Sequence, residues 1–269
     1  MAPDEEGVPT SLPPRPRTPA WQDRRMETPL GIAGLANARD LGGLERTDGS
    51  HTPAGVFVRA ETLDRVTDAG WHRLRTHGVK TVVDLRRPSE RTVSVPRDIT
   101  VRHVDLDGDE RHFWESREKD GQWGTPLYYV DHIGELPHRL AGALDEIARA
   151  RAGGILFHCS AGWDRTGLLA AVLLKAVGVT EDAATRDYLS SFANAETMAE
   201  LHCRSFDVVE RLSVLDRFGH TPESAFRDMY RRLDADAWLG AHVDVDTAEV
   251  VRTWRGAIRS APDLPSTSR

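Results

Sequence analysis

Apolar residues along the chain fall into short unbroken runs and longer stretches with an apolar position every three or four residues. Short runs bounded by turn residues are typical of buried strands, and the wider spacing is typical of helices. The predicted strands are Gly55 to Arg59, Thr81 to Leu85, Thr100 to Leu106 and Ile155 to His158. The predicted helices are Thr67 or Asp68 to Thr76, Glu135 to Ala152 and Gly167 to Val177, and the chain reads as mostly helical from Thr180 onward.

The order of these elements predicts a layered architecture. Strands that alternate with helices favour an α/β fold, in which a central, mainly parallel sheet carries helices on both faces, here with a helical C-terminal part. The helix from Gly167 to Val177 is apolar nearly all round and must be buried, but its apolar core is too short to cross a membrane. In such folds, binding sites lie at the carboxyl ends of the strands.

The two ends of the chain differ from the middle. Residues 1–29 hold seven of the 15 prolines, and acidic residues stand where an export signal would carry positive charge before an apolar run. We expect residues 1–29 to form a disordered Pro-rich arm, because they bury too little apolar surface to offset their ordering entropy. Residues 30–260 are expected to form a single domain, and residues 261–269 a flexible tail.

Composition and charge exclude several classes of protein. The net charge of −7 argues against a nucleic-acid partner, since a duplex binder normally presents a basic face. The two cysteines, Cys159 and Cys203, make no disulfide framework, which favours a reducing, cytoplasmic location, although secretion without a signal peptide stays open. The histidines show no metal-ligand spacing, so no metal and no other cofactor is expected.

One segment carries most of the candidate chemistry, His158-Cys-Ser-Ala-Gly-Trp-Asp-Arg-Thr-Gly167. It joins a predicted buried strand to the N-terminus of a predicted helix. Backbone N–H groups from Ser160 to Asp164 can turn inward as an anion-binding nest, and the helix dipole adds positive potential. Arg165 offers a planar fork suited to two oxygens of a phosphate. The segment therefore predicts a phosphate-binding loop.

The same field acts on Cys159. A thiol has an ordinary pKa of about 8.5, and positive potential would lower the pKa of Cys159 enough to form a thiolate at neutral pH. A thiolate against a bound phosphate can attack phosphorus and form a phosphocysteine intermediate. Thr166 could hydrogen-bond the sulfur and help it leave in the second step. The residues expected to bind substrate through this loop are Ser160, Ala161, Gly162, Trp163 and Thr166.

The spacing of Cys159 and Arg165 resembles the C-x5-R signature of cysteine-dependent phosphatases, the protein-tyrosine-phosphatase superfamily. Three further segments resemble successive family blocks, namely Asn37-Ala-Arg-Asp-Leu-Gly-Gly43, Phe57 to Ala60 with Leu63 through Asp68, and Val79 to Glu90 with its Asp84-Leu-Arg86 core. Together they are similar to the bacterial tyrosine phosphatase-like family that includes the mycobacterial tyrosine phosphatase B type. The resemblance covers about residues 30–195 well and the helical C-terminal part loosely.

This resemblance implies a protein-tyrosine-phosphatase-like fold and a phosphoric monoester hydrolase, with residues 30–260 as the phosphatase domain. It also implies that the general acid lies inside the loop, at Asp164, where it would protonate the leaving oxygen and later activate water. Asp84, at the end of a neighbouring strand, is the reserve candidate, and could equally orient Arg165 or hold the loop. His158 is expected to fix the loop through its ring nitrogens.

The substrate class stays open at this point. Mycobacterial-type loops commonly have Lys where this chain has Trp163, whereas Gly-Trp-Asp-Arg-Thr also resembles the loop of myotubularin-type phosphoinositide phosphatases. Trp163 could pack at the rim or form an aromatic wall against a phosphotyrosine ring. Phosphotyrosine or a dual-specificity phosphoprotein substrate leads, and a phospholipid headgroup is the alternative. A non-catalytic phosphate-binding module is the alternative from another class.

Three further features of the sequence bear on the site. The acidic run Val104 to Asp109 fits neither a calcium loop nor the Asp-x-Asp phosphotransfer motif, so a strand-to-loop exit is expected. Residues 107–126 are polar and aperiodic, which predicts a long loop, and we expect it to act as a lid over the phosphate loop. Cys203 is expected to be a small buried apolar residue rather than a redox partner of Cys159.

Overall fold

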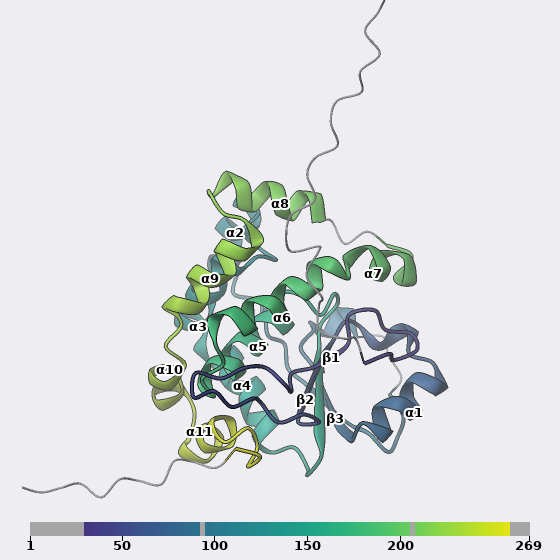
Figure 1. Ribbon diagram of the computed structural model, residues 1–269. Coiled ribbons are helices and arrows are strands. Elements are labelled where there is room, and N and C mark those ends of the chain that lie inside the picture. The colour runs from purple at the N-terminus through teal and green to yellow at the C-terminus, as the bar shows by residue number, and fades with distance from the viewer. Residues whose placement is uncertain (1–29, 92–94, 205–207, 259–269) are drawn as a thin grey trace, which may run out of the picture.

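The structure is a computed structural model that describes residues 30–91, 95–204 and 208–258. The expected arm, residues 1–29, and the expected tail, residues 261–269, lie outside the described residues. Figure 1 shows a central sheet between layers of helices, with most of the C-terminal half gathered on one side. The predicted α/β architecture, with a mainly parallel sheet and a helical C-terminal part, is confirmed.

The sheet has five strands in the order β1-β2-β5-β3-β4, which are Arg39–Asp40, Phe57–Ala60, Gly154–His158, Val79–Asp84 and Thr100–His103. Only β1 is antiparallel to its neighbour. In the register of the three central strands, His158 pairs with Ala60 on one side and with Asp84 on the other. The chain that leaves β5 at Cys159 therefore emerges at the carboxyl ends of three parallel strands, where the fold is expected to place its site.

The side chains of β5 point alternately into two hydrophobic cores, one on each face of the sheet, as the pleat of a buried strand requires. Leu156 faces the core formed with α1 (Asp68–Thr76), whereas Ile155 and Phe157 face the larger core on the opposite side. The larger core contains α5 (Arg165–Ala176), in which every residue from Arg165 to Leu174 is buried. Burying α5 against the sheet fixes the position of its N-terminus at Arg165, a short loop after Cys159.

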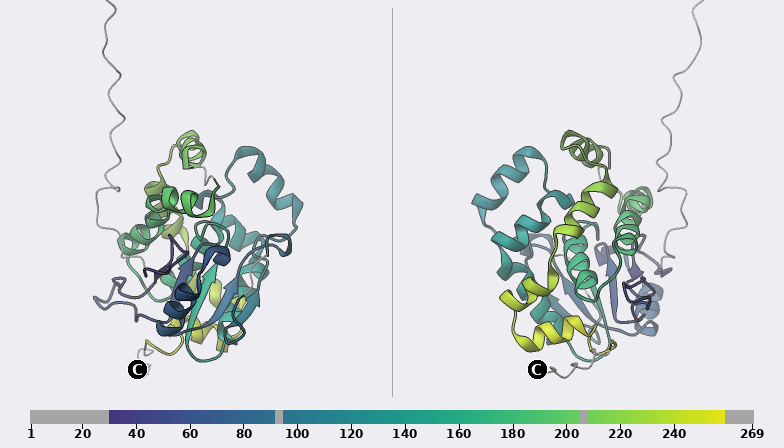
Figure 2. Two further views of the ribbon diagram at one scale, coloured as in Figure 1. Left: turned by 90° about the vertical axis from the view of Figure 1, so that its right-hand side faces the viewer. Right: turned by 60° about the vertical axis from the view of Figure 1, so that its left-hand side comes forward.

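The remaining helices complete the outer layers and the C-terminal part (Figure 2). They are α2 (Arg111–Asp120), α3 (Tyr129–Glu135), α4 (Pro137–Ala148), α6 (Glu181–Ala193), α7 (Ala195–His202), α8 (Val208–Arg217), α9 (Pro222–Arg232), α10 (Ala235–His242) and α11 (Val245–Arg252). Short 3-10 turns lie at Leu63–Arg65, Pro88–Glu90 and Pro126–Tyr128. Among the helices of the described residues, none combines the length and the apolar character that crossing a bilayer requires.

The expected element positions hold for most of the sheet, and Thr67 caps α1 by accepting a hydrogen bond from Gly70 N at 3.2 Å. The single helix expected from Glu135 to Ala152 is wrong. Two helices meet there, because Pro137 lacks an N–H and starts α4 at a position where that donor is not needed.

The long loop expected over residues 107–126 is also wrong, since α2 occupies its middle. This helix buries only Phe113 and Trp114 among polar side chains, so apolar positions do not recur at helical spacing and the pattern misses it. Cys203, expected to be buried, is exposed at the end of α7 with a φ of 51°. Both cysteines are free thiols.

Candidate active site

The loop from Cys159 to Arg165, which we call the Cys159 loop, joins β5 to α5 and makes its tightest turn at Gly162. This glycine has a φ of 64°, and a Cβ atom there would lie 2.4 Å from the backbone of Ala60 on β2. A side chain would therefore both strain the backbone and collide with the neighbouring strand. Asp164, just before the last residue of the loop, is the N-cap residue of α5.

Within the described residues, no N–H from Ser160 to Arg165 donates to another protein group. Unpaired N–H groups at a helix N-terminus are ready donors for an anion, and the dipole of α5 adds to their effect. Cys159, only 2% exposed, lies at the start of this ring of donors. The backbone of the loop therefore leaves these N–H groups available to an anion.

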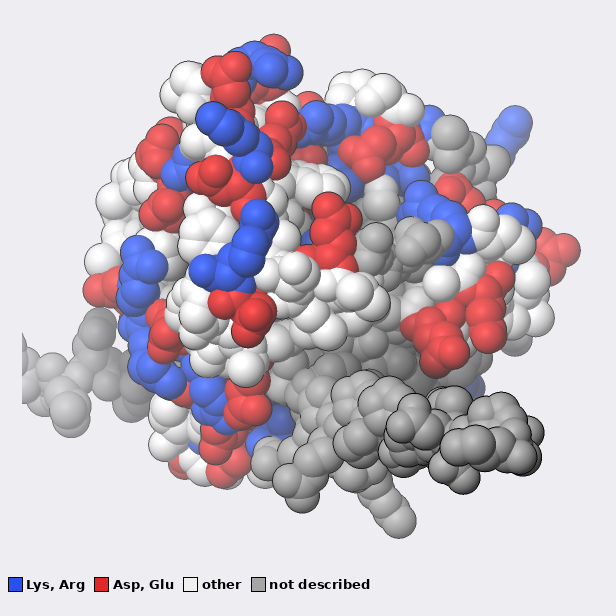
Figure 3. All heavy atoms as spheres, turned by 90° about the horizontal axis from the view of Figure 1, so that it is seen from above, with Lys and Arg blue, Asp and Glu red and all other residues white. Residues whose placement is uncertain are grey.

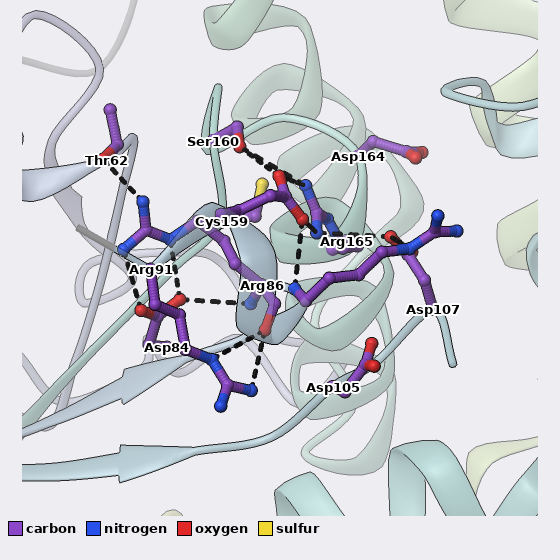
Figure 4. A network of polar contacts seen from close by, with 12 residues as sticks. Thr62, Asp84, Arg86, Arg91, Asp105, Asp107, Cys159, Ser160, Asp164 and Arg165 are labelled. Carbon is purple, nitrogen blue, oxygen red and sulfur yellow. Dashed lines mark hydrogen bonds and ion pairs between the residues drawn. The ribbon is translucent and has the colours of Figure 1, made fainter. Parts of the chain in front are cut away.

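A pocket of about 430 Å³ opens over the loop. On the loop side it is lined by Cys159, Ser160, Ala161, Asp164 and Arg165. The opposite wall includes Glu118 of α2, Trp123 just after it, Arg204, and Arg211 and Val214 of α8. Figure 4 shows Cys159, Ser160 and Arg165 converging from the loop and the start of α5. Five of the sequence-predicted site residues are thereby brought to one cavity.

The surface at this end of the molecule is not broadly basic. Figure 3 shows acidic and basic side chains intermixed over the described surface, in keeping with the net charge of −7. An anion must therefore be held by local groups, the loop donors and Arg165, rather than by a general positive field.

Arg165 is held by a carboxylate that sequence reasoning missed. Its Nη1 and Nη2 donate to Oε2 and Oε1 of Glu90 at 2.6 and 2.9 Å, and the Ser160 hydroxyl donates to the same Oε1 at 2.7 Å. Burial acts to raise the pKa of Glu90, but hydrogen bonds from Arg165 and Ser160 outweigh it and bring that pKa to about 2. The sequence does contain an indication of this role, because Glu90 is the last residue of the family-like segment Val79 to Glu90.

Asp107 is a second missed carboxylate at Arg165. Its Oδ2 lies 3.2 Å from Arg165 Nη1 and 3.3 Å from Arg87 Nε. Burial raises the pKa of Asp107 to about 6, although Arg165 and Arg87 oppose the rise. The residue was expected only to mark the exit from a strand. In the fold it lies against the guanidinium of the Cys159 loop.

Within the part of the chain that the structure describes, Asp164 has one paired and one unpaired carboxylate oxygen. The Tyr128 hydroxyl donates to its Oδ2 at 2.7 Å, while the buried Oδ1 has no hydrogen-bond partner among the described residues. Burial raises the pKa of Asp164, against the opposing effects of Arg211 and the Tyr128 hydroxyl. The protonated form therefore persists to a higher pH than in an exposed aspartate.

Asp84 does not join this constellation. Both of its carboxylate oxygens accept hydrogen bonds from Arg86, at 2.8 and 2.9 Å, and it lies in a separate cavity of about 200 Å³ beside His103 and His158. Its expected contact with Arg165 or with substrate is wrong, because the fork of Arg86 takes the carboxylate away from the Cys159 pocket (Figure 4). His158 does contact the loop, with Nδ1 3.1 Å from the Cys159 carbonyl oxygen.

The side chain of Trp163 is fully buried and lies beneath the loop. Its ring packs edge-on against Phe192 of α6, with 4.1 Å between centroids. Of the two alternatives for Trp163, packing and an aromatic wall against a substrate, the structure therefore favours packing. Trp123, 44% exposed, is the tryptophan that lines the pocket. Thr166 is buried at the first turn of α5, and its hydroxyl has no partner among the described residues.

Among the described residues there is no group of three or more His, Cys, Asp or Glu side chains arranged to hold a metal ion. The chemistry available in the pocket is that of a thiol, three arginines, carboxyl groups and backbone donors.

Comparison with known proteins agrees with this picture. Residues 30–255 match the profile of a family described as the tyrosine phosphatase family. A Cupriavidus necator protein named as a candidate tyrosine-protein phosphatase is 31% identical over 193 residues, which cover 65% of this chain and 67% of that protein. A tyrosine-protein phosphatase of Nostoc commune is 33% identical over 144 residues, 52% of this chain and 49% of the relative. The triple specificity protein phosphatase PtpB of Mycobacterium tuberculosis is 30% identical over 190 residues, 58% of this chain and 67% of the relative.

Proposed function

This chain belongs to the tyrosine phosphatase family and is a phosphatase, and we propose that it hydrolyses phosphomonoesters through a covalent intermediate on Cys159. The proposal rests on one observation, that Cys159, Arg165 and Asp164 line the same pocket at the N-terminus of α5. A nucleophile, an anion holder and a proton donor are thereby within one cavity. The thiolate requires a reducing environment, which a cytoplasmic location would supply.

In the first step the phosphate of the substrate binds to the loop N–H groups and to Arg165. The Cys159 thiolate attacks phosphorus, an S–P bond forms, and the bond from phosphorus to the leaving oxygen breaks. Asp164 gives its proton to that oxygen, so the alcohol or phenol leaves neutral. Because burial raises the pKa of Asp164, this residue holds its proton to a higher pH than an exposed aspartate does, which favours its role as the acid.

In the second step water attacks the phosphorus of phosphocysteine. The Asp164 carboxylate takes a proton from the water, the S–P bond breaks, and inorganic phosphate forms. The sulfur leaves as thiolate, stabilised by the dipole of α5 and, in this proposal, by the unpartnered hydroxyl of Thr166. Each residue returns to its starting state.

A phosphotyrosine or dual-specificity phosphoprotein is the substrate that the pocket supports best. Cys159 lies at the floor of a cavity walled by α2 and α8, so the phosphorus must be carried inward on an extended group. The exposed ring of Trp123 offers a face for an aryl leaving group. A phosphoinositide headgroup is the alternative, favoured by two further arginines in the same pocket, Arg204 and Arg211.

We also propose that α2 and the turn after it, within residues 107–126, form a lid over the pocket together with α8. The two parts are linked across the pocket mouth, since Arg211 donates to the Gly124 carbonyl and Arg217 Nη2 donates to the Asp120 carbonyl at 2.8 Å. These are contacts between exposed or half-buried groups, and such contacts open at little cost in free energy.

The test is hydrolysis of p-nitrophenyl phosphate in EDTA by the wild type and by the Cys159→Ser and Asp164→Asn variants. We expect wild-type turnover, none with Cys159→Ser, and a phosphoprotein trapped by acid quench that is absent from Cys159→Ser. A wild type that binds phosphate but does not turn over would support the non-catalytic module instead. Phosphotyrosine peptides, phosphoserine peptides and phosphoinositide vesicles then compare the substrate classes.

A further inference from the structure

All six carbonyl groups of the Cys159 loop from Cys159 to Asp164 accept hydrogen bonds from donors outside the loop. The donors are, in order along the loop, His158 Nδ1, Thr62 N, Asn37 Nδ2, Arg59 Nη2 for two successive carbonyls, and Tyr129 Oη. In a trans peptide the carbonyl and the following N–H point in opposite directions. Carbonyls fixed on the outer side therefore turn the N–H groups of residues 160–165 toward the pocket.

Two residues hold the middle of the loop. Asn37 Nδ2 donates to the Ala161 carbonyl at 3.0 Å, and Arg59 Nη2 donates to the Gly162 carbonyl at 2.9 Å and reaches the Trp163 carbonyl at 3.5 Å. Residues 161–163 belong to no helix or strand, and the pairing of β2 with β5 ends before them, at Ala60 and His158. Its conformation depends on these side chains.

The two donors are themselves fixed by a buried charge cluster. Arg59 Nη1 and Arg39 Nε donate to the two carboxylate oxygens of Asp187 on α6, and the Arg39 bond is 2.6 Å long. Arg39 Nη1 and Asn194 Nδ2 donate to Asn37 Oδ1 at 2.6 and 3.2 Å, which leaves the Asn37 amide nitrogen facing the loop.

Asn37, Arg39, Arg59 and Asp187 are each at most 2% exposed. A charged group that is buried is retained at considerable cost unless its partners are complete. Asp187 has two guanidinium partners, and the fork of Arg59 has one arm on Asp187 and the other on the loop. The cluster therefore links α6 to the backbone of the Cys159 loop through Arg59.

We infer that Asn37 and Arg59 are positioning residues that hold the Cys159 loop in its phosphate-binding conformation before a substrate arrives, with Asp187 as the anchor of Arg59. The inference rests on the proposed function, because it assigns these residues a role through the loop donors. If the loop is already ordered, none of the binding free energy is used to order it, so phosphate binds more tightly. The N–H donors are then also in position to stabilise the phosphoryl group during its transfer.

The test is the Kd of inorganic phosphate by titration calorimetry, with kcat for p-nitrophenyl phosphate in parallel, for wild type, Asn37→Ala and Arg59→Lys. The control is Leu144→Ala, a fully buried change on α4, which contributes nothing to the pocket. We expect each loop variant to weaken phosphate roughly tenfold, the effect of losing one or two hydrogen bonds, and to lower kcat. Leu144→Ala should lower Tm and leave Kd unchanged, because Kd reports only on folded molecules.

An unchanged Kd in folded Arg59→Lys would overturn the inference, since lysine keeps the charge beside Asp187 but cannot reach both Asp187 and the loop with a planar fork. If Asn37→Ala does not fold, the Kd of phosphate for Arg59→Lys alone tests the inference. The proposed function fails separately. A wild type that binds phosphate, with weaker binding in both variants but no turnover, would remove the mechanism and leave the positioning role in place.

Discussion

Glu90 and Arg165 form a bidentate ion pair, in which each Nη atom of the arginine donates to one oxygen of the carboxylate. Glu90 lies in the 3-10 turn Pro88–Glu90 after β3, and Arg165 lies at the start of α5 after β5. The pair fixes the plane of the guanidinium relative to the loop. Arg165 is therefore ordered before a substrate arrives, and a phosphate would use the guanidinium hydrogens that Glu90 does not take.

Replacing Glu90 with Gln should lower kcat/KM for an aryl phosphate on the order of ten- to hundredfold, because a charge-assisted pair is worth more than a neutral one. The change keeps the size of the side chain, so Tm should fall little. The matched control is Glu118→Gln, which removes a carboxylate from the wall of the same pocket but not from Arg165. Equal losses in the two variants would count against the orienting role.

The pH profile should report on Asp164. Because burial raises the pKa of Asp164, the protonated acid persists above the ordinary range, and kcat should fall on the alkaline side as that proton is lost. Tyr128 donates to the carboxylate and so favours the charged form. Tyr128→Phe should therefore move the alkaline limb to higher pH.

The control for this shift is Tyr129→Phe, whose hydroxyl donates to the main-chain carbonyl of Asp164 at 2.9 Å. It should move the limb less than Tyr128→Phe does. Asp164→Asn should remove the limb altogether. If the limb survives in Asp164→Asn, another group is the general acid, and Asp107 is the first to test.

Asp107 should make the protein less stable as pH rises. Its pKa of about 6 lies above the unfolded value, so the folded state binds the proton more tightly and loses stability between about pH 4 and pH 6. Two pKa units correspond to roughly 3 kcal/mol. Asp107→Asn removes the buried charge and should raise Tm at pH 8 but not at pH 4. A Tm difference independent of pH would contradict this.

Trp123 should favour aryl over alkyl phosphates. Trp123→Ala removes the exposed ring from the pocket wall and should lower kcat/KM several-fold for a phosphotyrosine peptide, with little change for a phosphoserine peptide. Phe218→Ala is the control, because Phe218 is similarly exposed, at 41%, but does not line the pocket. An equal fall in kcat/KM for both peptides would show that Trp123 contributes to the pocket wall but does not distinguish aryl from alkyl leaving groups.

The parts of the fold that the sequence predicts well are those with a local physical cause. The apolar runs before Asp84 and Cys159 mark β3 and β5, and the hydroxyl of Thr67 marks the start of α1. The nucleophile and its arginine follow from spacing alone, since both lie in one loop. In each case the residues that determine the outcome are neighbours in the chain.

The predictions that were wrong or incomplete concern side chains whose partners come from far along the chain. Trp163 packs on Phe192, and Asp84 is taken by Arg86 and not by the loop arginine. Arg211 reaches the pocket from α8, and no motif marks it. Burial and pairing of this kind depend on tertiary packing, which a local pattern does not record.

The link from Asp187 to the Cys159 loop has a consequence for how the enzyme becomes active during synthesis. When the ribosome has just completed the Cys159 loop, the nucleophile and its arginine have been made. Asp187, which anchors Arg59, and the α8 wall of the pocket have not yet been made. Until α5, α6 and α8 have emerged and docked, Cys159 lacks the surroundings that would lower the pKa of its thiol. Activity should therefore appear late and in one step, which protects the growing chain from premature phosphate binding.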